Sequence, residues 1–535
     1  TFYGKMSALN QAQCWLCISK LGCLCGVVLP IRPPCFLRET AAGVYEIRID
    51  LRSSVAPLTP LVSALSGSAK EDVASFHFPG HNRGRGAPTS LTQLITPNPY
   101  HHDLPELPQL DNLFSPQGPI LEAQNLAAAL FGAAQTWFLV NGTTCGIHAA
   151  VMATCPPNHH LILPRNSHLS AFSAMVLSGA LPKYLLPTYD HSWELPSCIT
   201  PRHVTHAIHD LLSQGKSPSA VLLVSPTYNG ICSNVDEISL ICKAHKIPLI
   251  VDEAHGAHFG FHPNLPRSSL QQGADIVVQS THKVLASLTQ SSMLHVAGET
   301  VDRDKISRCL QTLQSSSPSY LLLASLDAAT AQIAENPEKH FATALQLAGD
   351  TQEAISHIPG IDVLTSSCLS GHPTIDPLRI TVGLGGCGYE LDDDLEREYG
   401  VISEVCGPRS VTFAVSHGTR REDADRLVAA LKGLSSRKMG DDGIRGSGYS
   451  FGSTAPVLSP RDAFFCKKRR VRLEDSVGKL AGETICPYPP GIPVLLPGEI
   501  ITGEDLRFLS NIRSKGAVVT GASDAEFGSV LICDI

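Results

Sequence analysis

An aspartate and a lysine, Asp252 and Lys283, are the two residues of this chain whose types and spacing best suit chemistry. Asp252 follows the apolar run 247–251, and Lys283 lies shortly after the apolar run 274–279. A carboxylate at the end of a buried strand costs free energy unless a cation, such as a protonated pyridine nitrogen, pairs with it. A lysine amine can form a Schiff base with an aldehyde. The pair therefore favours pyridoxal phosphate (PLP) as cofactor.

Each of these residues also has an ordinary structural explanation. Asp252 could cap a turn or a helix at the end of its strand, and Lys283 could be a solvated surface lysine. Either explanation suffices for one residue alone. The two residues together, spaced across one strand–helix–strand unit, favour the cofactor.

Polar residues also follow three earlier apolar runs. Residues 136–140 precede the turn Asn141-Gly142-Thr143-Thr144 and a helical run at 145–154. A strand, a Gly/Thr turn and a helix start form an anion site, although a threonine at a helix start is often only a cap. The runs 160–163 and 220–224 end in Arg165-Asn166-Ser167-His168 and Ser225-Pro226-Thr227-Tyr228.

These runs predict the elements that must position the polar residues. From about Thr59 to Val296, apolar strands alternate with helical stretches, which is typical of βαβ units and a mostly parallel sheet. Ligands bind outside the carboxyl ends of the strands in such a sheet. The hydroxyl, imidazole, carboxylate and amine groups that follow five strands are therefore expected to surround one site.

The rest of the chain is predicted to form smaller units. A helical stretch at 320–344, a strand at 378–382 and a helix at 421–433 indicate a second α/β region, and five glycines between 436 and 456 indicate a linker. We therefore expect an N-terminal extension at 1–57, a large domain at 58–310, a small α/β domain at 311–435, a linker at 436–456 and a C-terminal domain at 457–535.

Composition argues against several classes of partner. The net charge of −8 gives no indication of nucleic-acid binding, and no apolar run reaches the roughly 18 residues that span a bilayer. The 17 cysteines are irregularly spaced, which favours reduced thiols over a disulfide framework. A zinc site at Cys14, Cys17, Cys23 and Cys25 is an alternative for that cluster, but no domain-like context surrounds it, and no metal is expected.

The first 38 residues contain four basic side chains and no acidic ones. This bias favours the remnant of a plastid (chloroplast) transit peptide, although the segment is not rich in serine. An extension of a cytoplasmic protein is the alternative.

Several segments resemble the Orn/Lys/Arg decarboxylase family, whose members have the aspartate-aminotransferase-like fold (PLP fold type I). The resemblance covers about residues 58–535 in the right order, and it is closest to the short bacterial-type arginine and lysine decarboxylases. It is carried by residues 76–84 (FHFPGHNRG), 103–107 (DLPEL), 138–144 (FLVNGTT), 252–258 (DEAHGAH), 280–283 (STHK), 488–493 (YPPGIP) and 497–499 (PGE).

The resemblance implies an α/β protein of PLP fold type I, with a large mostly parallel sheet domain, a smaller α/β domain and a small C-terminal domain. It implies decarboxylation of arginine, lysine or ornithine to the amine and CO2. Lys283 would form the Schiff base, Asp252 would pair with the pyridine nitrogen, and His168 would stack on the ring. The other implied contacts are Thr143, Thr144, Thr227, Ala254, His255, Ser280 and His282 for the cofactor, and Glu499 for the cationic end of the substrate.

Other implications and alternatives go with this resemblance. A homodimer or higher homo-oligomer is implied, with Ser315 or Ser316 reaching a neighbouring cofactor. The family commonly has lysine after the stacking histidine, whereas this chain has Leu169. An α-oxoamine synthase of the same fold, or an inactive regulatory paralogue, is the alternative function. Residues 79–81 and the C-terminal domain argue against the synthase, and retention of Lys283 with Asp252 argues against the inactive paralogue.

Overall fold

The computed structural model describes residues 58–436, 456–488 and 491–535, and three short strands before them. Those strands, β1 (Trp15–Ile18), β2 (Cys35–Glu39) and β3 (Tyr45–Ile49), form an antiparallel sheet in the order β1-β3-β2. Residues 1–58 make one compact unit, and residues 59–535 make another. Residues 437–455 of the predicted linker and the side chains of the four N-terminal cysteines lie outside the described residues. The zinc and targeting interpretations therefore stay predictions.

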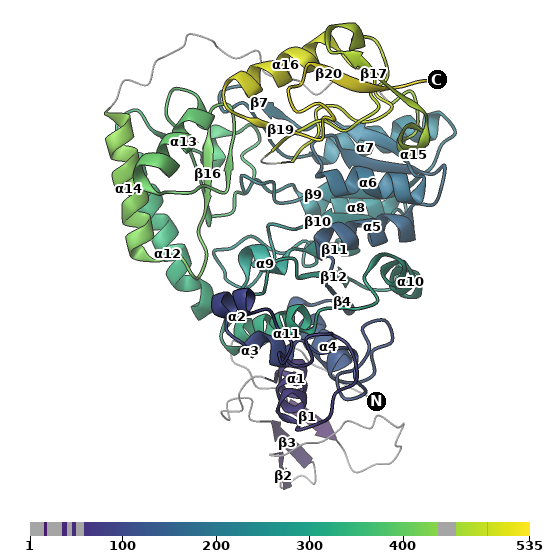
Figure 1. Ribbon diagram of the computed structural model, residues 1–535, viewed down its shortest axis with the longest axis vertical. Helices are drawn as coiled ribbons and strands as arrows, with labels where there is room; N and C mark the ends of the chain where they lie inside the picture. The colour runs from purple at the N-terminus through teal and green to yellow at the C-terminus, as the bar shows by residue number, and fades with distance from the viewer. Residues whose placement is uncertain (1–14, 19–34, 40–44, 50–57, 437–455, 489–490) are drawn as a thin grey trace. The chain divides into compact units, whose positions relative to one another are not determined.

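The larger unit is built around a seven-stranded sheet with the order β4-β12-β11-β10-β9-β5-β6 (Figure 1). Its strands are β4 (Gln135–Leu139), β5 (His160–Pro164), β6 (Leu181–Leu185), β9 (Pro218–Val224), β10 (Leu249–Asp252), β11 (Ile276–Gln279) and β12 (Ser292–Val296). Every neighbouring pair is parallel except the two pairs that β12 makes. Because β12 is antiparallel to both β11 and β4, β4 runs in the same direction as the other strands. The predicted mostly parallel sheet is confirmed.

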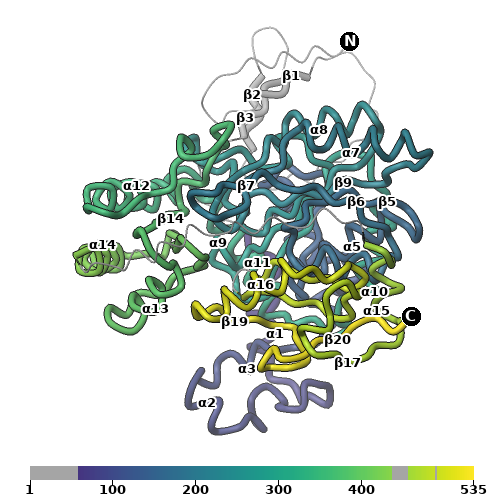
Figure 2. The backbone as a smooth tube through the Cα atoms, turned by 90° about the horizontal axis from the view of Figure 1, so that it is seen from above, coloured from purple at the N-terminus to yellow at the C-terminus, as the bar shows by residue number. Residues whose placement is uncertain are grey.

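Successive residues of each strand face opposite sides of this sheet, so the apolar runs supply two cores. In β10, Leu249 and Val251 pack in one core and Ile250 in the other. One face is covered by α1 (Pro60–Lys70), α4 (Pro119–Phe131), α7 (Pro201–Ser213), α8 (Val235–Ala244) and α11 (Tyr320–Glu335). The other is covered by α5 (Gly142–Thr154), α6 (Leu169–Ser178) and α10 (Arg303–Leu313) (Figure 2). Helices on both faces complete the expected α/β fold.

A smaller antiparallel sheet with the order β13-β14-β16-β15 forms the second α/β region. Its elements are β13 (Asp362–Val363), β14 (Arg379–Gly383), β15 (Val405–Cys406), β16 (Val411–Ala414), α12 (Pro337–Ser356), α13 (Gly388–Tyr399) and α14 (Arg421–Ser435). The helical stretch predicted at 320–344 is present but divided between two helices, because α11 ends at Glu335 and α12 begins at Pro337. The Asn336 side chain accepts a hydrogen bond from the Lys339 N–H at 3.1 Å and so caps α12, and Pro337 has no N–H with which to continue α11.

The C-terminal domain has its own core, with Ile485, Leu509 and Ile532 among its buried residues. It contains α15 (Pro460–Phe465), β17 (Lys468–Arg472), β18 (Cys486–Tyr488), α16 (Gly503–Ser514), β19 (Val518–Thr520) and β20 (Ser529–Cys533). Helix α15 packs against α6 of the large domain (Figure 1). Among the residues that the structure describes, no helix is long and apolar enough to cross a membrane.

Candidate active site

A cavity of about 220 Å³ lies at the carboxyl ends of the parallel strands. Its walls come from the turn after β4, the loop after β5, the ends of β9 and β10, and the short helix α9 (Thr281–Val284). We call it the cofactor cavity, because nine of the residues that the sequence predicted line it: Thr143, Thr144, His168, Asp252, Ala254, His255, Ser280, His282 and Lys283. The same-direction strands bring these distant residues to one edge of the sheet.

Asp252 is the only carboxylate among the described residues that line the cofactor cavity. It is buried at the end of β10, and its Oδ1 accepts a hydrogen bond from the Ala254 N–H at 3.2 Å. Burial raises the pKa of Asp252 to about 6, and the nearby Lys283 amine opposes this rise. A carboxylate with this single donor keeps acceptor capacity for a cationic ligand.

Lys283 faces Asp252 across the same cavity and is paired with a histidine. Its Nζ lies 3.0 Å from His255 Nε2. Burial lowers the pKa of the Lys283 amine, while the carboxylates of Asp252 and Glu404 oppose that shift. Burial also holds the pKa of His255 well below its ordinary value, with a further contribution from Lys283. The His255 ring is therefore a neutral acceptor for the amine, and a lysine with a lowered pKa is a better nucleophile.

The turn after β4 supplies an anion site. Helix α5 begins at Gly142, which has a φ of +75°, and the Asn141 side chain does not cap the helix. The first N–H groups of α5 are therefore available to a ligand. Beside them, Thr143 Oγ1 lies 2.6 Å from Ser280 Oγ and donates to Ser292 Oγ at 3.1 Å. Hydroxyl and N–H groups thus converge from two strand ends.

Two further histidines have fixed orientations. His168 is the N-cap of α6, where its Nδ1 accepts from the Ser170 N–H at 3.2 Å. Burial lowers the pKa of His168 to about 4, and Lys283 adds to this shift. His282 Nδ1 lies 2.8 Å from the Ser291 carbonyl oxygen and so donates to it. The His168 ring is consequently neutral, which suits stacking against an aromatic cofactor.

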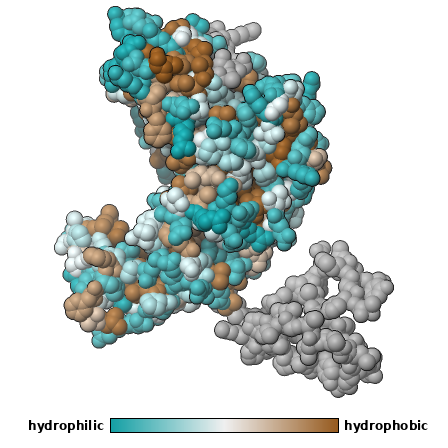
Figure 3. Space-filling model, turned by 90° about the vertical axis from the view of Figure 1, so that its right-hand side faces the viewer, coloured by the Kyte–Doolittle hydropathy of each residue, from teal (hydrophilic) through white to brown (hydrophobic). Residues whose placement is uncertain are grey.

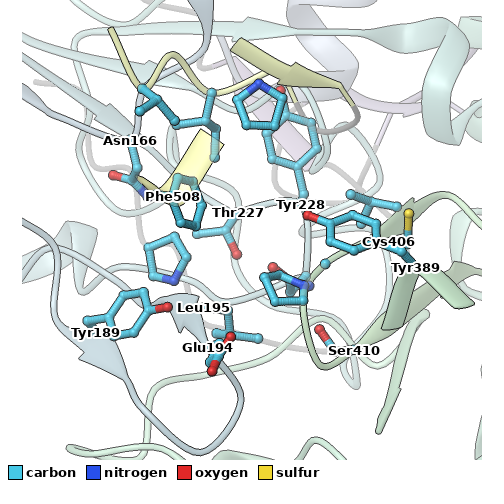
Figure 4. A pocket seen from close by; sticks show the side chains of 18 of the residues that line it. Asn166, Tyr189, Glu194, Leu195, Thr227, Tyr228, Tyr389, Cys406, Ser410 and Phe508 are labelled. Atoms are coloured by element: carbon cyan, nitrogen blue, oxygen red, sulfur yellow. The ribbon is translucent and has the colours of Figure 1, made fainter. Parts of the chain in front are cut away.

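Thr227 lines a second cavity, which has a volume of about 130 Å³ and which we call the chamber (Figure 4). Its Oγ1 accepts from the Ile231 N–H at 3.2 Å. The chamber shares Val224 and Tyr228 with the cofactor cavity. Its remaining walls are Asn166, Tyr189, Glu194, Leu195, Pro196, Asn229, Tyr389, Val405, Cys406, Gly407, Pro408, Ser410, Pro487, Ile492, Val494 and Phe508.

Glu499 lines neither cavity. It is buried, and its Oε2 accepts a hydrogen bond from Arg165 Nη2 at 2.8 Å. Arg165 also donates to the carbonyl oxygens of Pro493 and Val494, at 2.7 and 3.0 Å. The ion pair therefore ties the loop after β5 to the C-terminal domain, and the predicted contact of Glu499 with substrate stays a prediction.

Sequence reasoning missed a buried polar chain that crosses the sheet beneath the site. Glu253 Oε2 accepts from Gln279 Nε2 at 2.7 Å, Gln279 Oε1 lies 3.1 Å from His295 Nε2, and His295 Nδ1 lies 2.8 Å from Thr136 Oγ1. These residues link the loop after β10 to β11, β12 and β4. Glu253 beside Asp252, and His295 within an apolar run, are polar residues that need buried partners. The sequence does not reveal these partners, because they lie far away along the chain.

The donor set of the cofactor cavity fits pyridoxal phosphate. The free N–H groups of α5 with Thr143, Thr144 and Ser280 suit a phosphate. Asp252 suits a protonated ring nitrogen, and Lys283 suits an aldehyde. Among the described residues that line the cavity, no other charged group competes with Asp252 or Lys283, because burial lowers the pKa of His168, His255 and His282.

Comparison with known proteins agrees with this fit. Residues 59–378 match the family model described as "Orn/Lys/Arg decarboxylase, major domain", and residues 450–522 match "Orn/Lys/Arg decarboxylase, C-terminal domain". The chain is 36% identical over 481 residues to an arginine decarboxylase of Halalkalibacterium halodurans, covering 89% of this chain and 97% of that protein. It is 34% identical over 474 residues to an arginine decarboxylase of Bacillus subtilis, covering 87% and 96%.

A solved structure supports the fold independently. The crystal structure of a lysine decarboxylase from Francisella novicida superposes with a TM-score of 0.77 at 23% identity, covering 89% of this chain and 81% of the other. The expected PLP fold type I is therefore confirmed.

Proposed function

Because the chain belongs to the Orn/Lys/Arg decarboxylase family, we propose that it uses bound pyridoxal phosphate to remove the α-carboxylate of a basic amino acid as CO2. The observation that carries this function is the placement of Lys283 and Asp252 in one cavity, beside an anion site at the start of α5. The match of a C-terminal decarboxylase domain at 450–522 favours this function over an α-oxoamine synthase.

Arginine is the substrate that we propose first, with lysine second. The relatives at 34–36% identity that cover 87–89% of this chain are named arginine decarboxylases. The guanidinium of arginine and the ammonium of lysine differ in shape and in the hydrogen bonds they donate, so one pocket does not serve both equally.

Pyridoxal phosphate, when bound, supplies an electron sink for the bond between Cα and the carboxylate. Asp252, which is buried, would pair with the protonated ring nitrogen and so stabilise its positive charge. Lys283 would hold the cofactor covalently through Nζ, and the neutral His255 ring accepts a hydrogen bond from that amine, with 3.0 Å between Nζ and Nε2. Lys283 Nζ, which lines the same cavity, would be the group that delivers a proton to Cα of the product.

The test identifies both the attachment point and the product. Borohydride treatment should fix the cofactor on Lys283, as peptide mass mapping reports, and Lys283→Ala should remove both the label and the activity. The unaltered protein given arginine, lysine or ornithine should form the corresponding amine and CO2. A label on another residue excludes the assigned role of Lys283. Cofactor binding without any amine product supports the inactive paralogue.

We also propose that the chain forms a homodimer through the segment 76–102. This segment contains α2 (Thr89–Ile95) and α3 (Asn98–His102). Phe76, Phe78 and Leu94 in this segment are 99%, 84% and 78% exposed. The lobe at the lower left of Figure 3 shows brown and tan patches among hydrophilic ones. An apolar segment of this kind is typical of an interface, and a second copy of the chain is the proposed occupant.

Ser315 supports a link between this assembly and the site. It is exposed, and its N–H donates to Asn141 Oδ1 at 3.2 Å, immediately before the anion turn. A partner chain that covers this region would lie close to the cofactor cavity. The predicted contact of Ser315 or Ser316 with a neighbouring cofactor is part of this proposal.

A further inference from the structure

The chamber beside the cofactor cavity has an unusual charge balance. Glu194 is the one acidic residue in its walls, and the described lining contains no lysine, arginine or histidine. Glu194 is half-buried and makes no ion pair or hydrogen bond with the residues that the structure describes. An unpaired carboxylate facing a partly desolvated space attracts a cation.

Aromatic and aliphatic side chains make the other walls suitable for a cation on an apolar stem. The rings of Tyr189 and Tyr389 are close enough that the Glu194 charge raises the pKa of both phenols, although burial is the largest cause of each rise. Figure 4 shows these two tyrosines on either side of the chamber, with Glu194 at its lower edge. Aromatic faces attract cations, and Leu195 and Val405 provide apolar contact for a hydrocarbon chain.

The backbone at Glu194 points to a role for its side chain. Glu194 has a φ of +50°, a left-handed conformation that glycine or asparagine adopts at lower cost. It lies in the hairpin between β7 (Tyr189–Asp190) and β8 (Leu195–Pro196). The Asp190 Oδ1 accepts from the Ser192 and Trp193 N–H groups, each at 2.9 Å, and Trp193 is buried. These hydrogen bonds and the buried Trp193 fix the hairpin. The fixed hairpin holds Glu194 in its left-handed conformation at the wall of the chamber.

The chamber also lies in the right place relative to the reacting amine. Tyr228 lines both cavities, and Lys283 Nζ lies over its ring at 5.9 Å from the centroid. The His255 ring lies 4.7 Å from the same tyrosine. A substrate whose α-carbon is at Lys283 can therefore extend past Tyr228 into the chamber, and the distal cation of a basic amino acid is several bonds from that carbon.

We propose that Glu194, together with Tyr189 and Tyr389, recognises the distal cation of the basic amino-acid substrate. This inference rests on the proposed decarboxylase function and names the specificity site for it. The chamber gathers residues of all three domains, since Glu194 is in the large domain, Tyr389 in the small domain and Val494 in the C-terminal domain. Substrate recognition consequently depends on how the three domains are held together.

The test compares substrates that differ only in distal charge. Glu194→Gln should lower kcat/KM for the preferred basic amino acid by about ten- to a hundred-fold, mainly through KM, because one charge-assisted hydrogen bond is lost. A neutral amino acid of the same length, such as citrulline in place of arginine, should be processed as by the unaltered protein. Glu194→Asp keeps the charge on a shorter side chain. Its kcat/KM for the basic amino acid should lie between that of the unaltered protein and that of Glu194→Gln. The cofactor absorbance spectrum should be unchanged in both variants.

The control is Glu299→Gln, which removes an equal charge from an exposed glutamate outside both cavities and should have no effect. Equal losses for charged and neutral substrates in Glu194→Gln, or no loss at all, would overturn the inference while leaving the proposed function standing.

A binding measurement separates the two proposals if the unaltered protein decarboxylates no basic amino acid. Calorimetric titration of the cofactor-loaded protein with an alkylguanidine or an aliphatic diamine would then decide the inference. Binding at least tenfold weaker in Glu194→Gln than in the unaltered protein supports Glu194 as the cation site. Equal affinity, or no binding to either, overturns it.

Discussion

The cofactor cavity and the chamber share Val224 and Tyr228, yet their chemistry differs in kind. The cofactor cavity carries an amine, a carboxylate, three imidazoles and several hydroxyls, all at strand ends of one sheet. The chamber has mainly aromatic and aliphatic walls, and Glu194 is the single acidic residue among the described residues that line it. Groups that can move protons and hold a phosphate are thus separated from groups that can recognise a distant cation.

The difference also concerns how the two sites are built. One parallel sheet positions the cofactor cavity, so its geometry depends mainly on the packing of the large domain. The walls of the chamber come from segments far apart in the sequence, from Asn166 to Phe508, so its geometry depends on how these segments pack together. Substitutions in the cofactor cavity should therefore affect every substrate alike, whereas substitutions in the chamber should change the preference among substrates.

The largest effect is expected for Asp252→Asn. Losing the charge that keeps the ring nitrogen protonated should raise the barrier by about 3–4 kcal/mol, or about 10²–10³-fold in kcat. Measured kcat should fall by the same factor for basic and neutral amino acids, while cofactor remains bound. Glu237→Gln is the control, because this exposed carboxylate lines neither cavity. A change in substrate preference in Asp252→Asn would break the separation of the two sites.

Much of the cofactor cavity could be predicted because its signals are local. Asp252, Ser280 and Thr143 each follow an apolar run, and the direction of parallel strands brings such ends together. β12 had no such signal, because Ser292 and His295 interrupt its apolar pattern. His295 is buried there because Thr136 and Gln279 satisfy its nitrogens, and neither partner is close to it in sequence.

The chamber could not be predicted, because its walls come from separate parts of the chain and show no shared period. Nothing in the sequence around Tyr189 or Tyr389 indicates a shared site, because the two residues come together only in the folded chain. The same limit applies to Glu499, since its partner Arg165 lies 334 positions earlier. The break between α11 and α12 is different, because the sequence Asn336-Pro337 already contained a cap and a helix breaker.

An intermediate effect is expected for Glu499→Gln. Because Glu499 lines neither cavity, this variant tests whether substrate preference depends on the chamber alone. Loss of the buried ion pair with Arg165 should lower the free energy of unfolding by about 1.5–3 kcal/mol. Denaturant unfolding should report this loss, with the preference for charged over neutral substrates unchanged. A selective loss for the basic substrate would instead support the contact between Glu499 and the substrate that the family resemblance implies.

The smallest effect is expected for Leu94→Ser, which tests whether each pair of cavities is complete within one chain. Leu94 is 78% exposed in the segment proposed to bind a second copy. Removing its side chain from an interface should cost about 1.5 kcal/mol, or about tenfold in the dimer dissociation constant. Sedimentation velocity over a range of concentrations measures this shift, and Leu240→Ser on α8, 66% exposed on a different element, is the control. If activity falls with the dimer fraction while Leu240→Ser changes neither, the partner chain contributes to the site. Full activity in a strictly monomeric sample would contradict that contribution. It would mean that one chain supplies both complete cavities.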